Sequence, residues 1–379
     1  MIRNQRGFSL VELMVTMVVF VIAMVAAAQI LSGLIGQFKQ QSRVAESNVE
    51  GLVGLEMLRG DLEVAGSGLP WVMGDAAMGF ADYDEAVNDA TTDWDDTAYN
   101  DSPGNPPRAV VIDEPATGFQ TDPVNTPSDV LVIKAANITL NQAVRKWTYI
   151  SNNGGLPNIF RTWGNAEEDL AATDRIIVIN PERGSNRGIL LNNAGVFFTK
   201  VEDLPANGGA ASTVFEPTTN SYGSFLVYGI SEGADPRMPF NRADFYVRRP
   251  ANLPSRCEPS TGVLYKATIT NTTDATDGGK HVELPLLDCV GYMKAVVALD
   301  VSNDGNLTIL APPTGSTADV LRTQLKQIRV YIVAQEGQRD PTYQSPATIA
   351  VPDVDDFTVP DRNYRWKLYT LVVTPTSLR

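Results

Sequence analysis

The pattern of hydrophobic and polar positions begins with one long apolar run near the N-terminus. Between residues 13 and 35 only Thr16, Gln29, Ser32 and Gly33 interrupt it. About 20 such residues are enough to cross a bilayer as a helix. The pattern therefore predicts a membrane-spanning helix at the start of the chain.

After Lys39 the pattern becomes amphipathic and predicts that the helix continues. Apolar residues recur at three- and four-residue spacings that form one stripe of a helix, namely Leu52, Leu55, Leu58, Leu62 and Ala65. Glycines at positions 51, 54 and 60 weaken it. The segment GSGLP, residues 66–70, ends it with flexible residues and a proline. We expect one helix over about residues 9–65.

The next stretch, residues 71–127, indicates a long and weakly ordered acidic insertion. From Asp82 to Asp101 there are eight acidic residues and no basic residue. A charge run of this kind is typical of a solvated loop. A surface that binds calcium or a partner protein is the alternative.

Ten short segments rich in β-branched and aromatic residues predict strands. They are RAVVID, DVLVIKA, RIIVIN, GVFFTKV, SFLVYGI, ADFYVRR, GVLYKATI, YMKAVVALD, KQIRVYIVA and RWKLYTLVVT. Between the eighth and the ninth, residues 316–326 predict a short helix capped by Ser316, with Asp319 at its third position. A helix first and strands afterwards indicate an α+β fold with mainly antiparallel sheets.

The charge of the chain argues against nucleic acid as a partner. With 44 acidic and 30 basic residues the net charge is −14, so a phosphate backbone would be repelled. The single histidine, His281, is expected at the surface and excludes sites that need several imidazoles. No nucleophile motif accompanies it. The sequence thus predicts no catalytic site and no cofactor.

Two cysteines, Cys257 and Cys289, are compatible with one disulfide. Such a bond persists in an oxidising compartment such as the periplasm or the cell surface. Because the N-terminal segment independently argues for export, we expect the bond to form. Two unrelated buried thiols are the alternative.

The segment DVSNDG has the start of an EF-hand-like calcium loop. Asp300, Ser302 and Asp304 provide oxygen atoms at its first, third and fifth positions, and Gly305 follows. The twelfth position is Ala311, where such a loop needs a bidentate glutamate. A hairpin turn at Asp304 and Gly305 explains the same residues, so we expect no tightly bound calcium.

Tryptophans are dispersed along the chain, as Trp71, Trp94, Trp147, Trp163 and Trp366. Exposed tryptophans can stack on sugars in an adhesive surface, but filling a large β-rich core is the use that we expect. An adhesin would need a pocket or an exposed aromatic cluster at the end of the domain that lies away from the helix.

Glu12 is a carboxylate at the front of the apolar run and requires an explanation. A carboxylate in a membrane helix costs roughly 2.5–3.5 kcal/mol at the bilayer centre, less near the interface, and usually has a partner. Arg3 and Arg6 precede the run, so the positive-inside bias leaves the N-terminus in the cytoplasm and exports the rest. Cleavage between Gly7 and Phe8 would create an amine one helical turn before Glu12.

The segment RGFSLVEL resembles the type III signal of type IV prepilins and pseudopilins. It has a basic residue, glycine, phenylalanine, and then glutamate at the fifth position after the cut. The resemblance implies that a membrane prepilin peptidase cleaves after Gly7 and methylates Phe8. It also implies that Glu12 pairs with the N-terminal amine of a neighbouring subunit as the helix leaves the membrane for the filament.

Two other interpretations of this segment stay open. A plain membrane anchor would leave Glu12 at the interface. An ordinary secretory signal would use Arg3 and Arg6 as its charged region and be cut before Gln29. The secretory signal leaves Glu12 and the glycine–phenylalanine junction unexplained.

Several downstream segments look like those of the large minor pilin PilW family. They are LRGDLEVAG, SDVLVIKA, ALDVSNDGNL, LKQIRVYIVAQ and YRWKLYTLVVT. This resemblance implies a minor pilin at the start or tip of a type IV pilus, with prepilin peptidase, other minor and major pilins and a tip adhesin as partners. It also implies a single-pass inner-membrane prepilin whose periplasmic domain later reaches the pilus. The alternatives are a J-type pseudopilin of type II secretion, a surface adhesin subunit and an exported enzyme.

On this basis the sequence divides into five segments. Residues 1–7 form the leader peptide, 8–36 the transmembrane part of the helix, and 37–66 its amphipathic continuation. Residues 67–127 form the variable acidic insertion, and 128–379 form the β-rich globular domain.

Overall fold

The computed structural model describes most of the chain. The described ranges are residues 10–75, 79–88, 96–114, 128–152, 158–181, 188–210, 213–217, 223–310 and 316–378. Within the first helix, side chains are described for residues 10–31 and 51–63.

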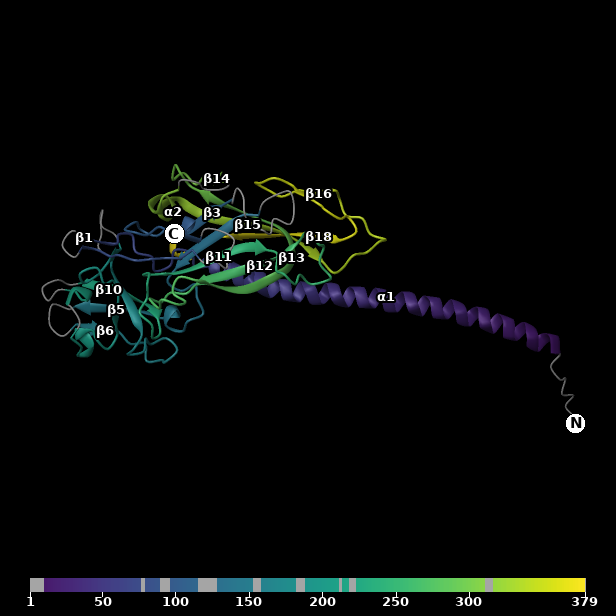
Figure 1. Cartoon of the computed structure of the whole chain (residues 1–379), viewed down its shortest axis with the longest axis horizontal. Helices are drawn as coiled ribbons and strands as arrows, with labels where there is room; N and C mark the ends of the chain where they lie inside the picture. The colour runs from purple at the N-terminus through teal and green to yellow at the C-terminus, as the bar shows by residue number, and fades with distance from the viewer. Residues whose placement is uncertain are drawn as a thin grey trace, which may run out of the picture.

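One long helix, α1 (Leu10–Glu63), extends away from a β-rich domain and reaches it only with its C-terminal turns (Figure 1). Its 54 residues correspond to a length of about 80 Å at 1.5 Å per residue. The bounds lie close to the expected 9–65, because the apolar run and the stripe that follows it are both local helical patterns.

The main sheet has eight strands in the order β18–β15–β13–β12–β11–β4–β3, with β14 paired to β13. Every pairing in it is antiparallel. The strands are β3 (Val110–Asp113), β4 (Val130–Ala135), β11 (Asn241–Arg248), β12 (Gly262–Ile269), β13 (His281–Leu299), β14 (Thr308–Leu310), β15 (Leu325–Glu336) and β18 (Arg365–Val373).

A second, six-stranded sheet is inserted in the chain between β4 and β11, in the order β6–β5–β10–β7–β8 with β9 on β7. Its strands are β5 (Trp147–Asn152), β6 (Ile159–Phe160), β7 (Arg175–Asn180), β8 (Ile189–Leu190), β9 (Thr199–Lys200) and β10 (Gly223–Ser231). The strands β5, β6 and β10 lie at the end of the domain opposite to α1 (Figure 1).

Two small hairpins and a few short helices complete the described fold. The hairpins are β1 (Gly74–Asp75) with β2 (Gly79–Phe80), and β16 (Thr348–Ile349) with β17 (Phe357–Thr358). The short helices are α2 (Ala318–Gln324) and the 3-10 turns Asp96–Tyr99, Ala143–Arg145, Pro205–Asn207, Thr213–Phe215 and Thr376–Leu378. The expected α+β fold with mainly antiparallel sheets is confirmed.

The cap of α2 differs from the expected one. Thr317, not Ser316, is the N-cap, because its hydroxyl oxygen accepts a hydrogen bond from the amide of Val320 at 3.4 Å. Thr317 has the extended conformation that a capping residue needs. Asp319 is therefore at the second helical position, where it still faces the positive end of the helix.

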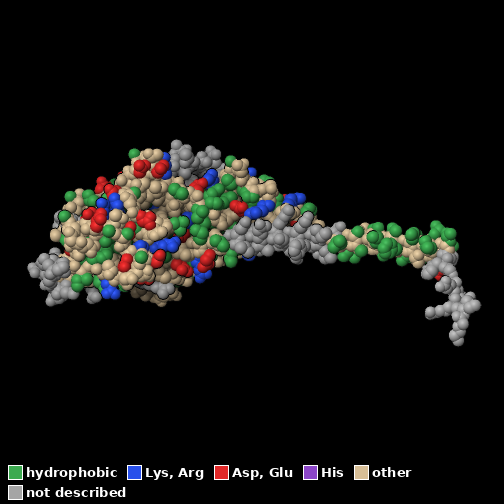
Figure 2. All heavy atoms as spheres, turned by 90° about the horizontal axis from the view of Figure 1, so that it is seen from below, with side chains coloured by type: hydrophobic (Ala, Val, Ile, Leu, Met, Phe, Trp, Pro, Cys, Tyr) green, Lys and Arg blue, Asp and Glu red, His purple; other side chains and the backbone are tan. Residues whose placement is uncertain are grey.

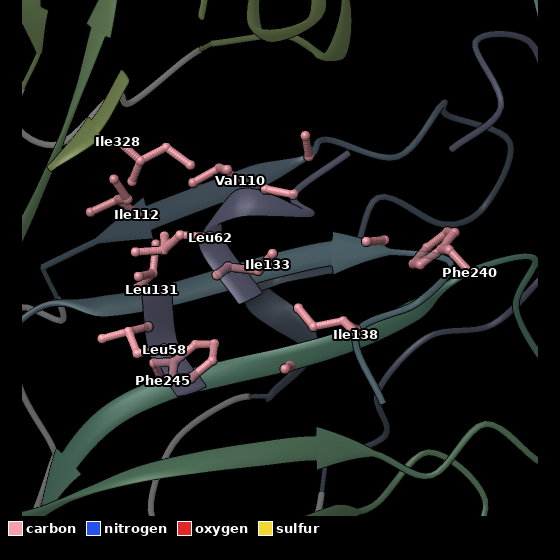
Figure 3. Packing of buried hydrophobic residues seen from close by; sticks show 14 of the residues in the cluster. Leu58, Leu62, Val110, Ile112, Leu131, Ile133, Ile138, Phe240, Phe245 and Ile328 are labelled. Carbon is pink, nitrogen blue, oxygen red and sulfur yellow. The ribbon is translucent and has the colours of Figure 1, made fainter. Parts of the chain in front are cut away.

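The core is formed where α1 meets the main sheet. Figure 3 shows Leu58 and Leu62 of α1 together with Leu131 and Ile133 of β4 and Phe245 of β11. All five side chains are fully buried. Burial of each such side chain is worth about 1.5–3 kcal/mol. Leu55, Leu58 and Leu62 of the predicted stripe thus form the face of α1 that packs on the sheet, and Ala65 is buried just after the helix. The prediction is wrong for Leu52, which is 69% exposed.

Part of the acidic stretch is buried rather than solvated. The carboxylates of Glu85 and Asp101 both lie 2.6 Å from the ammonium of Lys134 in β4, whose side chain is fully buried. Arg242 of β11 pairs with Lys134 in the sheet register, and its guanidinium is 3.5 Å from Glu85. The expectation of a solvated loop is wrong for Glu85 and Asp101, because two adjacent buried cations need neutralising charges. We call Glu85, Asp101, Lys134 and Arg242 the buried charge cluster.

The single histidine belongs to the edge of this cluster. The His281 side chain is 2% exposed, and its Nε2 lies 3.0 Å from the carboxylate of Asp244, which also pairs with Arg242 at 2.7 Å. The expectation of a surface histidine is therefore wrong. Burial alone would raise the pKa of Asp244, but the charge of Arg242 and the hydrogen bond with His281 outweigh it and hold that pKa well below its usual value.

Candidate membrane and assembly site

The N-terminal part of α1 presents an apolar surface on all sides. Its large hydrophobic side chains between residues 10 and 31 are all more than half exposed, and Figure 2 shows them along the helix that extends from the domain. The segment Leu10–Leu31 has 22 residues and is long and apolar enough to cross a membrane. Its length of about 33 Å matches the hydrocarbon core of a bilayer.

The helix itself accommodates two polar groups of this segment, Glu12 and Thr16. Glu12 is in the first turn of α1, where the helix dipole favours a negative charge and where a carboxylate is nearest the end of the apolar surface. The Thr16 hydroxyl donates to the carbonyl of Leu13 at 2.9 Å, so it is satisfied within the helix. Gly7 and Phe8, the expected processing residues, lie outside the described residues.

Two glycines allow α1 to approach β13 closely. A Cβ atom built on Gly54 would lie 2.0 Å from the backbone oxygen of Leu286, and one on Gly51 would lie 2.8 Å from the Leu287 side chain. The helix backbone therefore packs directly against the strand. The glycines that weaken the helix in isolation are those that permit this contact, whereas a Cβ on Gly60 would meet no described atom within 4 Å.

An apolar groove runs along this junction. It has a volume of about 570 Å³ and is lined by Val53 and Met57 of α1, by Leu284 and Leu286 of β13, and by polar groups that include Arg256. Val53 is 60% exposed. An exposed apolar surface is thus also present where the C-terminal part of α1 meets the β domain.

Polar contacts hold the C-terminal turn of α1 on the domain. The Lys266 ammonium of β12 is 2.6 Å from the Asp61 carboxylate and donates to the carbonyl of Ile138 at 3.0 Å. Thr376 and Ser377, near the C-terminus, donate through their hydroxyls to the carbonyls of Glu63 and Ala65. The two hydroxyl bonds satisfy backbone carbonyls at the end of α1, where a helix leaves carbonyls without intrahelical partners.

The structure contains the disulfide between Cys257 and Cys289, whose Cα atoms are 5.0 Å apart. Both residues are buried. The bond joins the loop before β12 to the middle of β13, beside the groove residue Arg256, which donates to the carboxylate of Asp288 at 2.9 Å. It closes a loop of 32 residues, for which the chain-entropy estimate is about 3–4 kcal/mol.

The Asp300 segment forms a turn. The two carboxylate oxygens of Asp300 accept from the amides of Asp304 and Gly305 at 3.1 and 3.3 Å, and Asp304 accepts from the amide of Asn306 at 2.9 Å. Gly305 has a φ of 84°, which favours glycine. Ser302 lies in the same turn, and Ala311 lies outside the described residues.

Calcium should therefore leave the unfolding temperature of the full-length protein unchanged. The Asp300 and Asp304 carboxylates already accept backbone amides, and the segment lacks the bidentate glutamate of a complete loop. A calcium titration followed by thermal unfolding tests this. A rise of several degrees that disappears in the Asp304→Ala variant would contradict it.

Sequence reasoning missed the buried charge cluster and the exposure of two tryptophans. Trp147 and Trp163 are 47% and 37% exposed, so the expectation that tryptophans fill the core is wrong for both. Trp94 lies outside the described residues. Among the residues that the structure describes, no group of three His, Cys, Asp or Glu side chains is placed to hold a metal ion.

Comparison with known proteins bears on the N-terminus alone. Residues 2–28 match the family model described as the prokaryotic N-terminal methylation motif. No curated protein and no solved structure matches the chain. Together with the apolar helix, the motif supports a membrane-anchored, pilin-like protein.

Proposed function

We propose that this chain is a subunit of a type IV filament system, and more specifically a minor pilin of the PilW type. The observation that carries the proposal is the order of features along α1. A methylation motif covers residues 2–28, Glu12 lies in the first turn, an exposed apolar surface follows, and the helix then packs on a β domain. A plain anchor needs neither the motif nor the acid.

In this proposal the chain is inserted in the inner membrane with its β domain in the periplasm. Prepilin peptidase then cleaves between Gly7 and Phe8 and methylates the new N-terminus. The apolar surface of α1 leaves the lipid and packs on the helices of other pilins. Glu12 pairs with an N-terminal amine there, because a buried charge in an apolar bundle needs a partner.

The size of the β domain supports a place at the start or tip of the pilus. A subunit repeated along a helical filament must leave room for its neighbours, and this domain carries an eight-stranded and a six-stranded sheet on one helix. Such a subunit would contact a tip adhesin. A J-type pseudopilin of type II secretion would carry the same N-terminal signal and is the second candidate. The proposal includes no catalysis and no cofactor.

The intact mass of the isolated protein tests the processing step. We expect the mature chain to begin with N-methylated Phe8 and to have a formal charge of −16, because the loss of Arg3 and Arg6 subtracts two from −14. A chain that retains Arg3 and Arg6 would show a plain anchor. A chain that begins at Gln29 would show a secretory signal.

The Glu12→Val variant tests the charge pairing separately. It should be inserted and cleaved normally, because the junction is untouched and hydrophobicity rises. Its incorporation into filaments should fall about tenfold or more, since an unpaired ammonium in an apolar bundle costs well over 1.4 kcal/mol. Glu56→Val, the same change at an exposed position of α1, is the control. Normal incorporation of Glu12→Val would rule out the pairing.

A further inference from the structure

Two exposed tryptophans meet at the end of the domain that lies away from α1. Trp147 begins β5 and Trp163 follows β6 in the second sheet, the sheet shown opposite to α1 in Figure 1. Their rings are in an edge-to-face arrangement with centroids 5.5 Å apart. Exposed large aromatic side chains in contact with each other cost solvation free energy unless something covers them.

The loop that carries Trp163 is held in place by hydrogen bonds. The indole Nε1 of Trp163 donates to the carbonyl of Trp147 at 2.9 Å. The amides of Trp163 and Gly164 donate to the carboxylate of Asp169 at 2.6 and 3.1 Å. Lys146 donates to the carbonyl of Ala166 at 3.0 Å. The two indoles are therefore positioned before any ligand arrives, which lowers the entropic cost of binding.

The tryptophans line a pocket together with charged side chains of both signs. The pocket has a volume of about 340 Å³, at the lower end of the range for small-molecule sites. Its lining residues are Arg145, Lys146, Trp147, Trp163, Glu167 and Glu168. The guanidinium of Arg161 lies over the Trp163 ring at 5.5 Å, so Trp147 presents the more exposed ring.

We propose that this pocket binds a pyranose unit of a glycan. The C–H face of a pyranose is apolar and stacks on an indole ring, which amphipathic aromatic side chains accommodate well. Its hydroxyls both donate and accept, so they match the carboxylates of Glu167 and Glu168 as well as the cations of Arg145 and Lys146.

Other ligand classes fit this lining less well. A purely apolar ligand would leave the four charged side chains desolvated. An anionic ligand would face two carboxylates and a chain of net charge −14, and a cationic ligand would face Arg145 and Lys146. A peptide is the remaining competitor. The proposal is independent of how the N-terminus is processed.

Binding can be measured on the full-length protein in a zwitterionic detergent that has no sugar headgroup. The probes are maltotriose, cellotriose and tri-N-acetylchitotriose, and the signal is tryptophan fluorescence. We expect at least one probe to bind with a dissociation constant below about 1 mM. Trp147→Ala should weaken that binding about tenfold, and Trp147→Phe should weaken it less, because a smaller aromatic ring remains.

A second variant keeps the test valid if Trp147→Ala does not fold. Glu167→Gln removes only a carboxylate of the pocket and should weaken binding several-fold. Glu202→Gln, an exposed acid paired with Lys200 outside the pocket, is the matched control and should change nothing. The proposal is overturned if no probe binds at concentrations up to about 10 mM, or if a probe binds equally to the wild type and to both pocket variants. The competing ligand class is tested with an immobilised peptide array. Binding to that array without binding to any oligosaccharide would also overturn the proposal.

Discussion

Replacing Lys134 by methionine should lower the free energy of unfolding by about 3–5 kcal/mol at pH 7. The Lys134 ammonium is fully buried and lies 2.6 Å from both Glu85 and Asp101, and it also donates to the carbonyl of Tyr99. Methionine fills a similar volume but leaves two buried carboxylates with less positive charge around them. Urea unfolding of the full-length protein in detergent, followed by tryptophan fluorescence, measures the loss.

The loss in the free energy of unfolding caused by Lys134→Met should become smaller as the pH falls. Burial alone would raise the pKa of Asp101, but the charges of Lys134 and Arg108 outweigh it and hold that pKa below its usual value in the wild type. This interaction therefore stabilises the wild type above about pH 4 and is lost as the pH falls through the folded-state pKa. In the variant Asp101 lacks the ammonium of Lys134, so burial favours its neutral form more strongly and acid relieves the uncompensated charge. We expect the difference in the free energy of unfolding between the two proteins to be smaller at pH 4.5 than at pH 7.

The matched control is Lys200→Met, which removes a surface ion pair. Lys200 is 3.6 Å from Glu202, and both side chains are more than one-third exposed. Its effect should stay within about 0.5 kcal/mol. The double variant Lys134→Met with Glu85→Gln should recover part of the loss, because it removes one of the two stranded charges. Equal effects of the two lysine variants would contradict the role of the buried charge cluster.

The sequence predicted α1 and the general fold because these depend on local patterns. The apolar run and the stripe of Leu55, Leu58 and Leu62 repeat within a few residues, and the structure places that stripe in the core. The motif that contains Gly7, Phe8 and Glu12 is equally local. These features could therefore be recognised without knowledge of tertiary contacts.

The sequence prediction missed the strands β5, β6 and β8 of the second sheet, of which β6 and β8 have only two residues each. The longest of the three, β5, was missed because its inward positions are polar. In β5 the buried positions include Thr148 and Asn152, so the alternation of apolar residues is weak. Hydrogen bonds compensate, since Thr148 donates to the carbonyl of Arg161 at 2.6 Å and Asn152 to the side chain of Asn158 at 2.5 Å. Conversely, the apolar segment GVFFTKV contains only the two-residue strand β9 (Thr199–Lys200).

The buried charge cluster could not be predicted because its members are far apart in the chain. Glu85, Lys134 and Arg242 come from a loop and two strands, and no spacing rule connects them. A partial signal exists, since VLVIKA places a lysine inside an otherwise apolar strand. Such a cation needs a carboxylate partner when it is buried. The acidic run supplies it, but only the fold shows which acids reach it.

Replacing Gly54 by alanine should destabilise the protein, although alanine is the better helix former. The added Cβ would lie 2.0 Å from the carbonyl oxygen and 2.7 Å from the carbonyl carbon of Leu286, which are backbone atoms of β13. Either α1 or β13 must therefore move, and overpacking of this kind costs about 1–3 kcal/mol or more. The gain in helix propensity, up to about 1 kcal/mol, offsets only part of this.

The same substitution at two other glycines of α1 separates packing from helix propensity. Gly60→Ala should stabilise the protein by about 0.5–1 kcal/mol, because its Cβ meets no described atom within 4 Å and the helix gains propensity. The effect of Gly51→Ala on the free energy of unfolding should lie between those of Gly54→Ala and Gly60→Ala. The atom nearest to its added Cβ is the end of the flexible Leu287 side chain, at 2.8 Å. Urea unfolding of the three variants gives the order directly. If Gly54→Ala stabilised the protein as much as Gly60→Ala, α1 could not pack on β13 through its backbone, and the glycines would serve only to make the helix flexible.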